Sequence, residues 1–198
     1  MIVWGGFAPG FSNTGGRYNP VLNSWTATTT INAPSSRAYH TAVWTGNEMI
    51  IWGGTDVFND FNTGGKYSPT TDSWVPTSIT NAPSGRYGLT AVWTGSEMII
   101  WGGGSHLSTG GRYDPITDSW TATSTTNSPS RREYHAAVWT GSEMIVWGGT
   151  DQFFYFFNSG GRYCAQSGPP PSPTPTPTPC MGRCSPTPRP RPTPAPRP

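Results

Sequence analysis

The stretch EMIVWGG at residues 143–149 is a near copy of residues 97–103 and 48–54, which both read EMIIWGG. The chain also opens on this string, because residues 1–6 read MIVWGG. Four copies of one apolar string, each ending in two glycines, indicate an internal repeat. We expect this repeat to decide the fold.

The spacing of four tryptophans gives the length of the repeat. Trp4, Trp52, Trp101 and Trp147 follow one another at intervals of 48, 49 and 46 residues. A period of about 50 residues is typical of a solenoid, a propeller or an array. The length varies only between the two glycine pairs of each copy, where the inserts hold 8, 9, 6 and 10 residues. The repeat therefore has one loop that is free to change.

Each constant segment has the composition of a β-strand. Residues 38–44, AYHTAVW, are followed by the turn sequence TGNE and by residues 49–52, MIIW, which predicts a hairpin. Two further strands are expected at residues 65–67 and 73–78, with a turn at Pro69 between them. The runs AVW and MIIW are apolar at consecutive positions, which indicates strands covered on both faces. Four antiparallel strands in each repeat predict an all-β propeller built from blades.

The positions of other residues point to a family. Each repeat places an Arg, often followed by a His, before the first strand, and then a Gly-Gly pair, a Tyr and a Trp in the later strands. In this pattern residues 1–163 resemble the kelch repeat, whose propellers include the galactose-oxidase-like fold. One copy departs from the pattern, because Leu89 stands where the others have His40 and His135. The resemblance therefore implies no role that needs this His in every blade.

The repeats also predict where the blades are incomplete. The first copy begins at its second strand and the last copy stops after its third, at Tyr163. We therefore expect an incomplete propeller at residues 1–163, with two full blades flanked by two partial ones. Because kelch-like rings typically contain more blades, the resemblance implies a fragment of a larger protein. Open blade edges can pair with another chain, so self-association is also expected.

The rest of the chain, residues 164–198, is a Pro/Thr-rich tail. Of the 22 prolines, 14 follow Gly168, and this segment cannot form a core. We expect an extended, disordered linker or tail. The role of Cys164, Cys180 and Cys184, which lie at or beyond the end of the propeller part, stays open.

Charge and composition exclude some classes of protein. The propeller part carries a net charge of −2 and the tail one of +4, so no nucleic-acid partner is expected for the folded part. No apolar run approaches the ~20 residues that a membrane span requires. A core built without thiols fits both an exported and a cytosolic protein. We expect an extracellular or cell-surface location, with a signal peptide upstream of Met1.

The candidates for catalysis or metal binding are few. The tryptophans occupy repeat positions and are expected in the core, and the carboxylates of Asp72, Asp114 and Asp118 are expected to cap turns. Some kelch-fold proteins are copper oxidases with two His, two Tyr and a Tyr bonded to Cys, a set that this sequence does not reproduce. We therefore expect no metal, no cofactor and no enzymatic activity. The alternative is a fragment of a propeller enzyme, such as a carbohydrate oxidase or a sugar isomerase, with its active site in other blades.

The phenylalanines are the strongest candidates for binding, because all eight lie in the variable loops. Phe61, Leu107 and Phe157 each stand three residues before a glycine pair and are expected to pack on their own blade. In an up-and-down blade this loop shares a face with the connection to the next blade, which contains an Arg. The predicted ligand-binding residues are Phe7, Phe58, Phe153, Phe154, Tyr155, Arg37, Arg86 and Arg132. The expected function is a noncatalytic scaffold of an exported bacterial protein that recognises a protein or a glycan.

Overall fold

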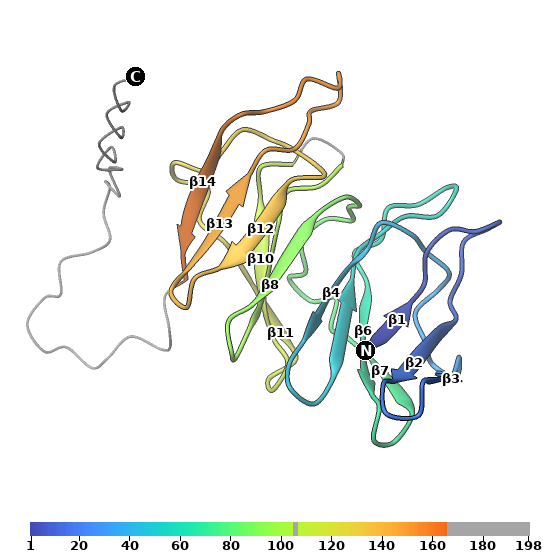
Figure 1. Ribbon diagram of the computed structural model, residues 1–198. Helices are drawn as coiled ribbons and strands as arrows, with labels where there is room; N and C mark the ends of the chain where they lie inside the picture. The colour runs from blue at the N-terminus through green and yellow to red at the C-terminus, as the bar shows by residue number, and fades with distance from the viewer. Residues whose placement is uncertain (105–106, 166–198) are drawn as a thin grey trace, which may run out of the picture. The chain divides into compact units, whose positions relative to one another are not determined.

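A computed structural model describes residues 1–104 and 107–165, and Figure 1 labels most of their strands. Residues Met1–Ala165 form one compact unit. This part of the chain contains fourteen β-strands and no helix, so the predicted all-β fold is confirmed. The tail predicted at residues 164–198, with its expected disorder, lies outside the described residues from residue 166 onward.

The strands form four antiparallel sheets, each built from consecutive strands. The first sheet contains β1 (Ile2–Trp4), β2 (Gly15–Asn19) and β3 (Ser24–Ala27). The second contains β4 (Thr41–Trp44), β5 (Met49–Trp52), β6 (Gly64–Ser68) and β7 (Ser73–Pro76). The third contains β8 (Thr90–Trp93), β9 (Met98–Trp101), β10 (Gly110–Asp114) and β11 (Ser119–Ala122). The fourth contains β12 (Ala136–Trp139), β13 (Glu143–Trp147) and β14 (Gly160–Cys164). Two four-stranded sheets flanked by two three-stranded ones are the predicted incomplete propeller.

The first strand of each repeat is shorter than predicted. In the second sheet it begins at Thr41 instead of residue 38, because Tyr39 adopts a left-handed backbone conformation with φ of 56°. Tyr134 has the same conformation before β12, with φ of 52°. The fourth strand also ends early, at Pro76, because the N–H of Ser78 instead donates to the carboxylate of Asp118 at 2.9 Å.

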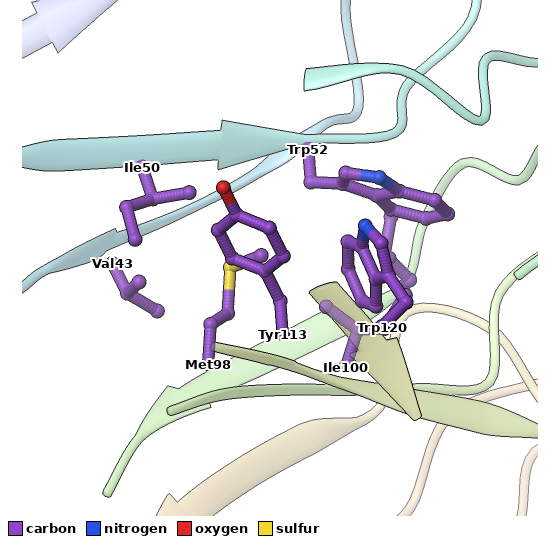
Figure 2. Packing of buried hydrophobic residues seen from close by; sticks show 8 residues of the cluster. Val43, Ile50, Trp52, Met98, Ile100, Tyr113 and Trp120 are labelled. Atoms are coloured by element: carbon purple, nitrogen blue, oxygen red, sulfur yellow. The ribbon is translucent and has the colours of Figure 1, made fainter. Parts of the chain in front are cut away.

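The core lies between neighbouring sheets. Val43, Ile50 and Trp52 of the second sheet pack against one face of the third sheet (Figure 2). The side chains that they meet there are those of Leu89, Met98, Ile100, Tyr113 and Trp120. The alternate residues of β5, Met49 and Ile51, point the other way and pack with Trp4 of the first sheet. Every residue of β5 is buried, which confirms that both faces of the MIIW strand are covered.

Polar contacts also join each sheet to the preceding one. The indole N–H of Trp120 donates to the carbonyl of Ser78 at 3.0 Å, and within the third sheet Tyr113 donates its hydroxyl to Asp118 at 2.5 Å. The same contacts recur one repeat earlier, where Trp74 donates to Thr29 at 3.1 Å and Tyr67 to Asp72 at 2.6 Å. Burial, together with the bond to Asp72, raises the pKa of Tyr67 to about 12. Asp72 and Asp118 also accept the N–H groups of Thr29 and Ser78 from the preceding repeat, so these turn aspartates join neighbouring sheets.

Candidate ligand-binding face

The variable loops and the connections between repeats lie on one side of the sheets. The N–H of Arg86 donates to the carbonyl of Phe61 at 3.2 Å, and Gly54 donates to the carbonyl of Arg86 at 2.8 Å. One repeat earlier, Arg37 donates in the same way to Ser12 at 3.0 Å. We call this side the loop face, and it comprises the loops 5–14, 53–63 and 148–159 with the connections 28–40, 77–89 and 123–135. These hydrogen bonds confirm the prediction that the two kinds of segment share a face.

The arginines of the loop face are buried. Arg86 is only 1% exposed, and its guanidinium donates to the carbonyls of Gly102 at 3.1 Å and Thr109 at 2.8 Å, at the two ends of one variable loop. Arg37 and Arg132 are also buried and make equivalent bonds. Burial lowers the pKa of Arg86 to about 10. Each connection thus carries a cation on this face, as predicted, and backbone carbonyls hold its side chain inside the fold. Ligand contact by them stays an untested prediction.

Two of the phenylalanines pack under these arginines. The guanidinium of Arg37 lies 4.1 Å from the ring centre of Phe61, and that of Arg132 lies 4.4 Å from the ring centre of Phe157. Both pairs are within the range of a cation–π contact. Phe61 and Phe157 therefore pack on their own blades, as their distance from the glycine pair predicted.

The predicted aromatic ligand-binding residues of the loops are exposed. Phe153, Phe154 and Tyr155 are 63%, 77% and 70% exposed, and Phe7 and Phe58 are also exposed. The carboxylate of Asp151 fixes the turn that contains Phe153 and Tyr155, since it accepts hydrogen bonds from the N–H of Phe153 at 2.9 Å and of Tyr155 at 3.1 Å. The turn thus presents a run of aromatic side chains to solvent.

The same turn recurs in the second repeat. Asp56 accepts the N–H of Phe58 at 2.7 Å. Both turns follow the sequence GGTD, at residues 53–56 and 148–151, which is the local signal for them. The exposed Phe156, which the sequence reasoning left out, belongs to the same loop as Phe154.

A cluster of three tyrosines on the loop face was also missed. The rings of Tyr39, Tyr87 and Tyr134 form a triangle with centre-to-centre distances of 6.1, 6.4 and 6.4 Å. The N–H of Tyr134 donates to the carbonyl of Gly88 at 2.8 Å, which joins adjacent connections. Burial, followed by the charge of Glu133, raises the pKa of Tyr134 to about 12. A Tyr one or two residues after the Arg of each repeat was the available signal.

A small cleft connects this cluster with the aromatic loop of the fourth sheet. Its volume is about 160 Å³, and its lining includes Tyr87, Arg131, Glu133, Asp151 and Phe154. Pockets for small molecules usually exceed about 300 Å³. The cleft therefore suits one inserted side chain better than a whole small-molecule ligand.

His40 and His135 each pack edge-on against a tryptophan of the preceding sheet. His135 forms a hydrogen bond of 2.7 Å with Thr90, and its ring lies edge-on to Trp101 with centres 5.2 Å apart. Burial, assisted by the charge of Arg132, lowers the pKa of His135 to about 4. Burial and Arg37 lower the pKa of His40 in the same way, also to about 4. Among residues 1–104 and 107–165, no three His, Cys, Asp or Glu side chains gather closely enough to hold a metal ion.

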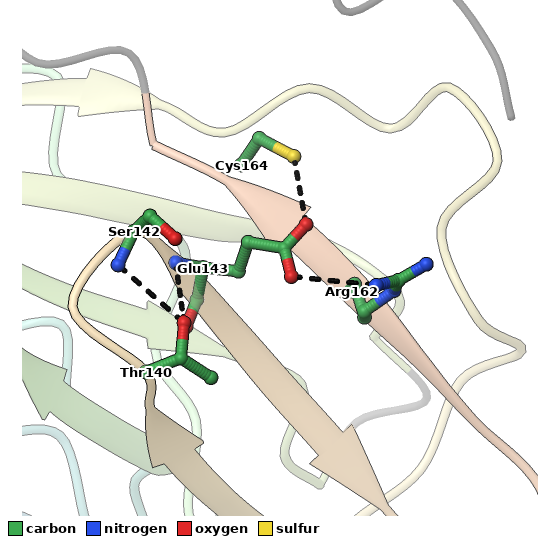
Figure 3. Close-up of polar contacts among 5 residues, drawn as sticks. All are labelled: Thr140, Ser142, Glu143, Arg162 and Cys164. Carbon is green, nitrogen blue, oxygen red and sulfur yellow. Dashed lines mark hydrogen bonds and ion pairs between the residues drawn. The ribbon is translucent and has the colours of Figure 1, made fainter. Parts of the chain in front are cut away.

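The recurring glutamates pair across strands. Glu143 lies 3.5 Å from the guanidinium of Arg162 and accepts a hydrogen bond of 3.4 Å from the thiol of Cys164 (Figure 3). Glu97 lies 3.8 Å from Arg112 in the same arrangement. Glu97 and Glu143 thus each connect the second strand of their sheet to the third.

Comparison with known proteins agrees with this architecture. A family model described as the KLHDC2/KLHL20/DRC7 Kelch-repeats domain matches residues 1–149. A search of curated proteins found no significant match. The match covers most of the chain, all four sheets have Gly-Gly after the second strand of the kelch pattern, and the first three also have a Trp in the fourth strand. The chain therefore belongs to the kelch-repeat family.

Proposed function

We propose that the chain is a noncatalytic scaffold that binds a protein partner through the exposed aromatic side chains of its loop face. Kelch repeats form protein-interaction scaffolds, so the family supports this class of function. The observation that carries the proposal is the run Phe153–Tyr155, which a turn set by Asp151 holds in solvent. Aromatic side chains on a rigid framework are frequent anchors of protein interfaces.

The contacts of the titratable residues support a noncatalytic role. His40 and His135 are neutral near pH 7 because burial lowers their pKa values to about 4. Asp72 and Asp118 accept hydrogen bonds that join sheets, and Glu143 pairs with Arg162. These groups are engaged in the fold, which favours an interaction scaffold over the alternative of a propeller oxidase or isomerase.

A glycan is the second candidate ligand. Tyr39 and Tyr134 expose about half of their surface beside a cleft that also contains Arg131 and Asp151. Aromatic rings next to charged groups can stack on a sugar and bond its hydroxyls. The exposed phenylalanines nevertheless favour a protein, because they offer apolar area without polar groups to satisfy.

Selection from a library of displayed peptides tests the proposal. Peptides selected on the full chain are titrated against the wild type and against the variant Phe153→Ser, Phe154→Ser, Tyr155→Ser. We expect a loss of affinity of at least tenfold, because an anchoring aromatic residue contributes more than about 1 kcal/mol to binding. The three positions are exposed, so the thermal midpoint of the variant should match that of the wild type.

The control changes the opposite face. Substituting Asn47 and Ser96, which lie in the hairpin turns after β4 and β8, should leave peptide affinity unchanged. Loss of binding in this control but not in the loop variant would contradict the proposal. A glycan array gives a further readout. If the chain binds glycans and the library yields no binding peptide, the ligand is a sugar and not a protein.

We further propose that the protein is exported to the extracellular space or the cell surface. The support is the Pro/Thr-rich sequence after residue 168, a composition typical of extended spacers. No helix in the described ranges is long and apolar enough to cross a membrane. Fractionation of producing cells tests export, since recovery of the protein only from the cytosol would contradict it.

A further inference from the structure

Each interface between neighbouring sheets is formed by two different sets of side chains. We call the set on the earlier sheet the forward half and the set on the later sheet the backward half. Each inner sheet carries both, one on each face. The forward half of the second sheet consists of Val43, Ile50 and Trp52. The backward half of the third sheet, which receives it, includes Met98, Ile100, Tyr113 and Trp120. Trp52 and Trp120 form the centre of the contact, with rings 5.1 Å apart. Trp4 and Trp74 repeat this contact one sheet earlier, at 5.4 Å.

The fourth sheet carries a forward half that the described residues leave uncovered. Val138, Ile145 and Trp147 occupy the positions of Val43, Ile50 and Trp52 in the repeat. Trp147 is 59% exposed, whereas Trp52 is fully buried. The exposed fractions differ because the third sheet covers Trp52, whereas no described sheet covers Trp147.

The first sheet carries the matching backward half, which is also uncovered. Met1, Val3, Tyr18 and Trp25 stand at the positions of Met98, Ile100, Tyr113 and Trp120. Trp25 is 53% exposed, whereas Trp120 is 4% exposed. The rings of Tyr18 and Trp25 are nevertheless 5.1 Å apart, almost the 5.0 Å found between Tyr113 and Trp120. The uncovered half already has the geometry of a covered one.

A polar contact of the same kind accompanies two of the covered interfaces, those between the first and second sheets and between the second and third. Arg17 donates to the carbonyl of Pro69 in the next sheet at 2.7 Å, and Lys66 donates to that of Pro115 at 3.1 Å. Arg162 in β14 holds the equivalent donor position, and Pro20 after β2 holds the equivalent acceptor position. The two uncovered halves thus carry the donor and the acceptor positions of a covered interface, and Arg162 at the donor position also pairs with Glu143.

We propose that two copies of this chain dock head to tail, with the forward half of the fourth sheet of one copy on the backward half of the first sheet of the other. A second copy fits because both halves of an interface that already forms inside the chain are present on one molecule. The contact joins different surfaces, so it is heterologous. It uses sheet faces and differs from the pairing of strand edges that the sequence suggested. Since it leaves the loop face open, it is independent of the proposed function.

Two variants of the full chain test this arrangement by sedimentation velocity over a range of concentrations. Trp147→Glu places a charge in the forward half, and Trp25→Glu places one in the backward half. The wild type should associate as its concentration rises, and each variant alone should be monomeric. An equimolar mixture of the two variants should form dimers and nothing larger, because only one intact pair of surfaces remains. An isologous contact would not be restored by mixing.

Controls separate the proposed contact from other causes of association. Phe58→Glu places the same charge on an exposed residue of the loop face and should leave association unchanged. Val138→Glu, at another exposed residue of the forward half, should behave like Trp147→Glu and replaces it if that variant does not fold. Three results would overturn the proposal: a wild type that is monomeric throughout, a Trp147→Glu variant that still associates fully, or a mixture that remains monomeric.

Discussion

Replacing His40 and His135 by Leu should remove most of the dependence of stability on pH between about 6.5 and about 4. Leu is a conservative choice here because the third sheet already carries Leu89 at the equivalent position. Both histidines are held in the neutral form, with pKa values of about 4, chiefly by burial and then by Arg37 and Arg132. The Nδ1 atom of each ring is also buried without a hydrogen-bond partner among the described residues, so a second proton has no acceptor there.

The direction in which stability changes with pH follows from the pKa values of each histidine in the folded and the unfolded chain. The folded pKa lies below the unfolded value of about 6.5, so the unfolded chain binds more protons in this range. The contribution of these histidines to the free energy of unfolding is therefore fully present above pH 6.5, and it falls as the pH decreases toward 4. With about 1.4 kcal/mol for each pKa unit, the loss is on the order of 3 kcal/mol for each histidine. Asp56 and Asp72 have lowered pKa values, so their contributions are lost mainly below this window.

Urea unfolding followed by tryptophan fluorescence at pH 7, 6, 5 and 4.5 gives the measurement. The free energy of unfolding of the wild type should fall across this series, that of each single Leu variant about half as steeply, and that of the double variant little. At pH 7 His135→Leu should cost only about 1 kcal/mol, for the lost bond to Thr90. A flat wild-type profile, or an equally steep one in the double variant, would refute the reasoning.

Three further predictions, the first with a matched control variant, test the packing and the polar contacts, each by the free energy of unfolding in urea. Trp52→Ala should destabilise the fold by about 3 to 5 kcal/mol because the side chain is fully buried, and Trp147→Ala, at the same repeat position but exposed, should cost far less. Arg86→Met should cost about 3 kcal/mol, because the carbonyls of Gly102 and Thr109 lose their donor, and a loss below about 1 kcal/mol would show that those bonds are weak. Tyr113→Phe removes the hydrogen bond to Asp118 and should cost about 1 to 2 kcal/mol, while no change would mean that the carboxylate finds another donor.

Local pattern was enough to predict the strands and their grouping into sheets. In MIIW at residues 49–52 every position is apolar, and a strand sends successive side chains to opposite faces, so both faces of the sheet had to be covered. The turn TGNE and the glycine pairs then determined where the first and second strands of a repeat end. The strands and the turns between them depend on residues only a few positions apart, so a repeated local sequence is enough to predict them.

The orientation of the loop-face residues depended on contacts distant in the sequence. Arg86 precedes a strand and could point outward, but the carbonyls of Gly102 and Thr109, 16 and 23 residues later, bind its guanidinium inside. The tyrosine triangle likewise joins residues from three repeats. Trp25 and Trp120 are the same residue in the same repeat position, yet only the second is covered by a neighbouring sheet. Burial is a property of what the fold places beside a side chain, and for these residues only the tertiary structure decided it.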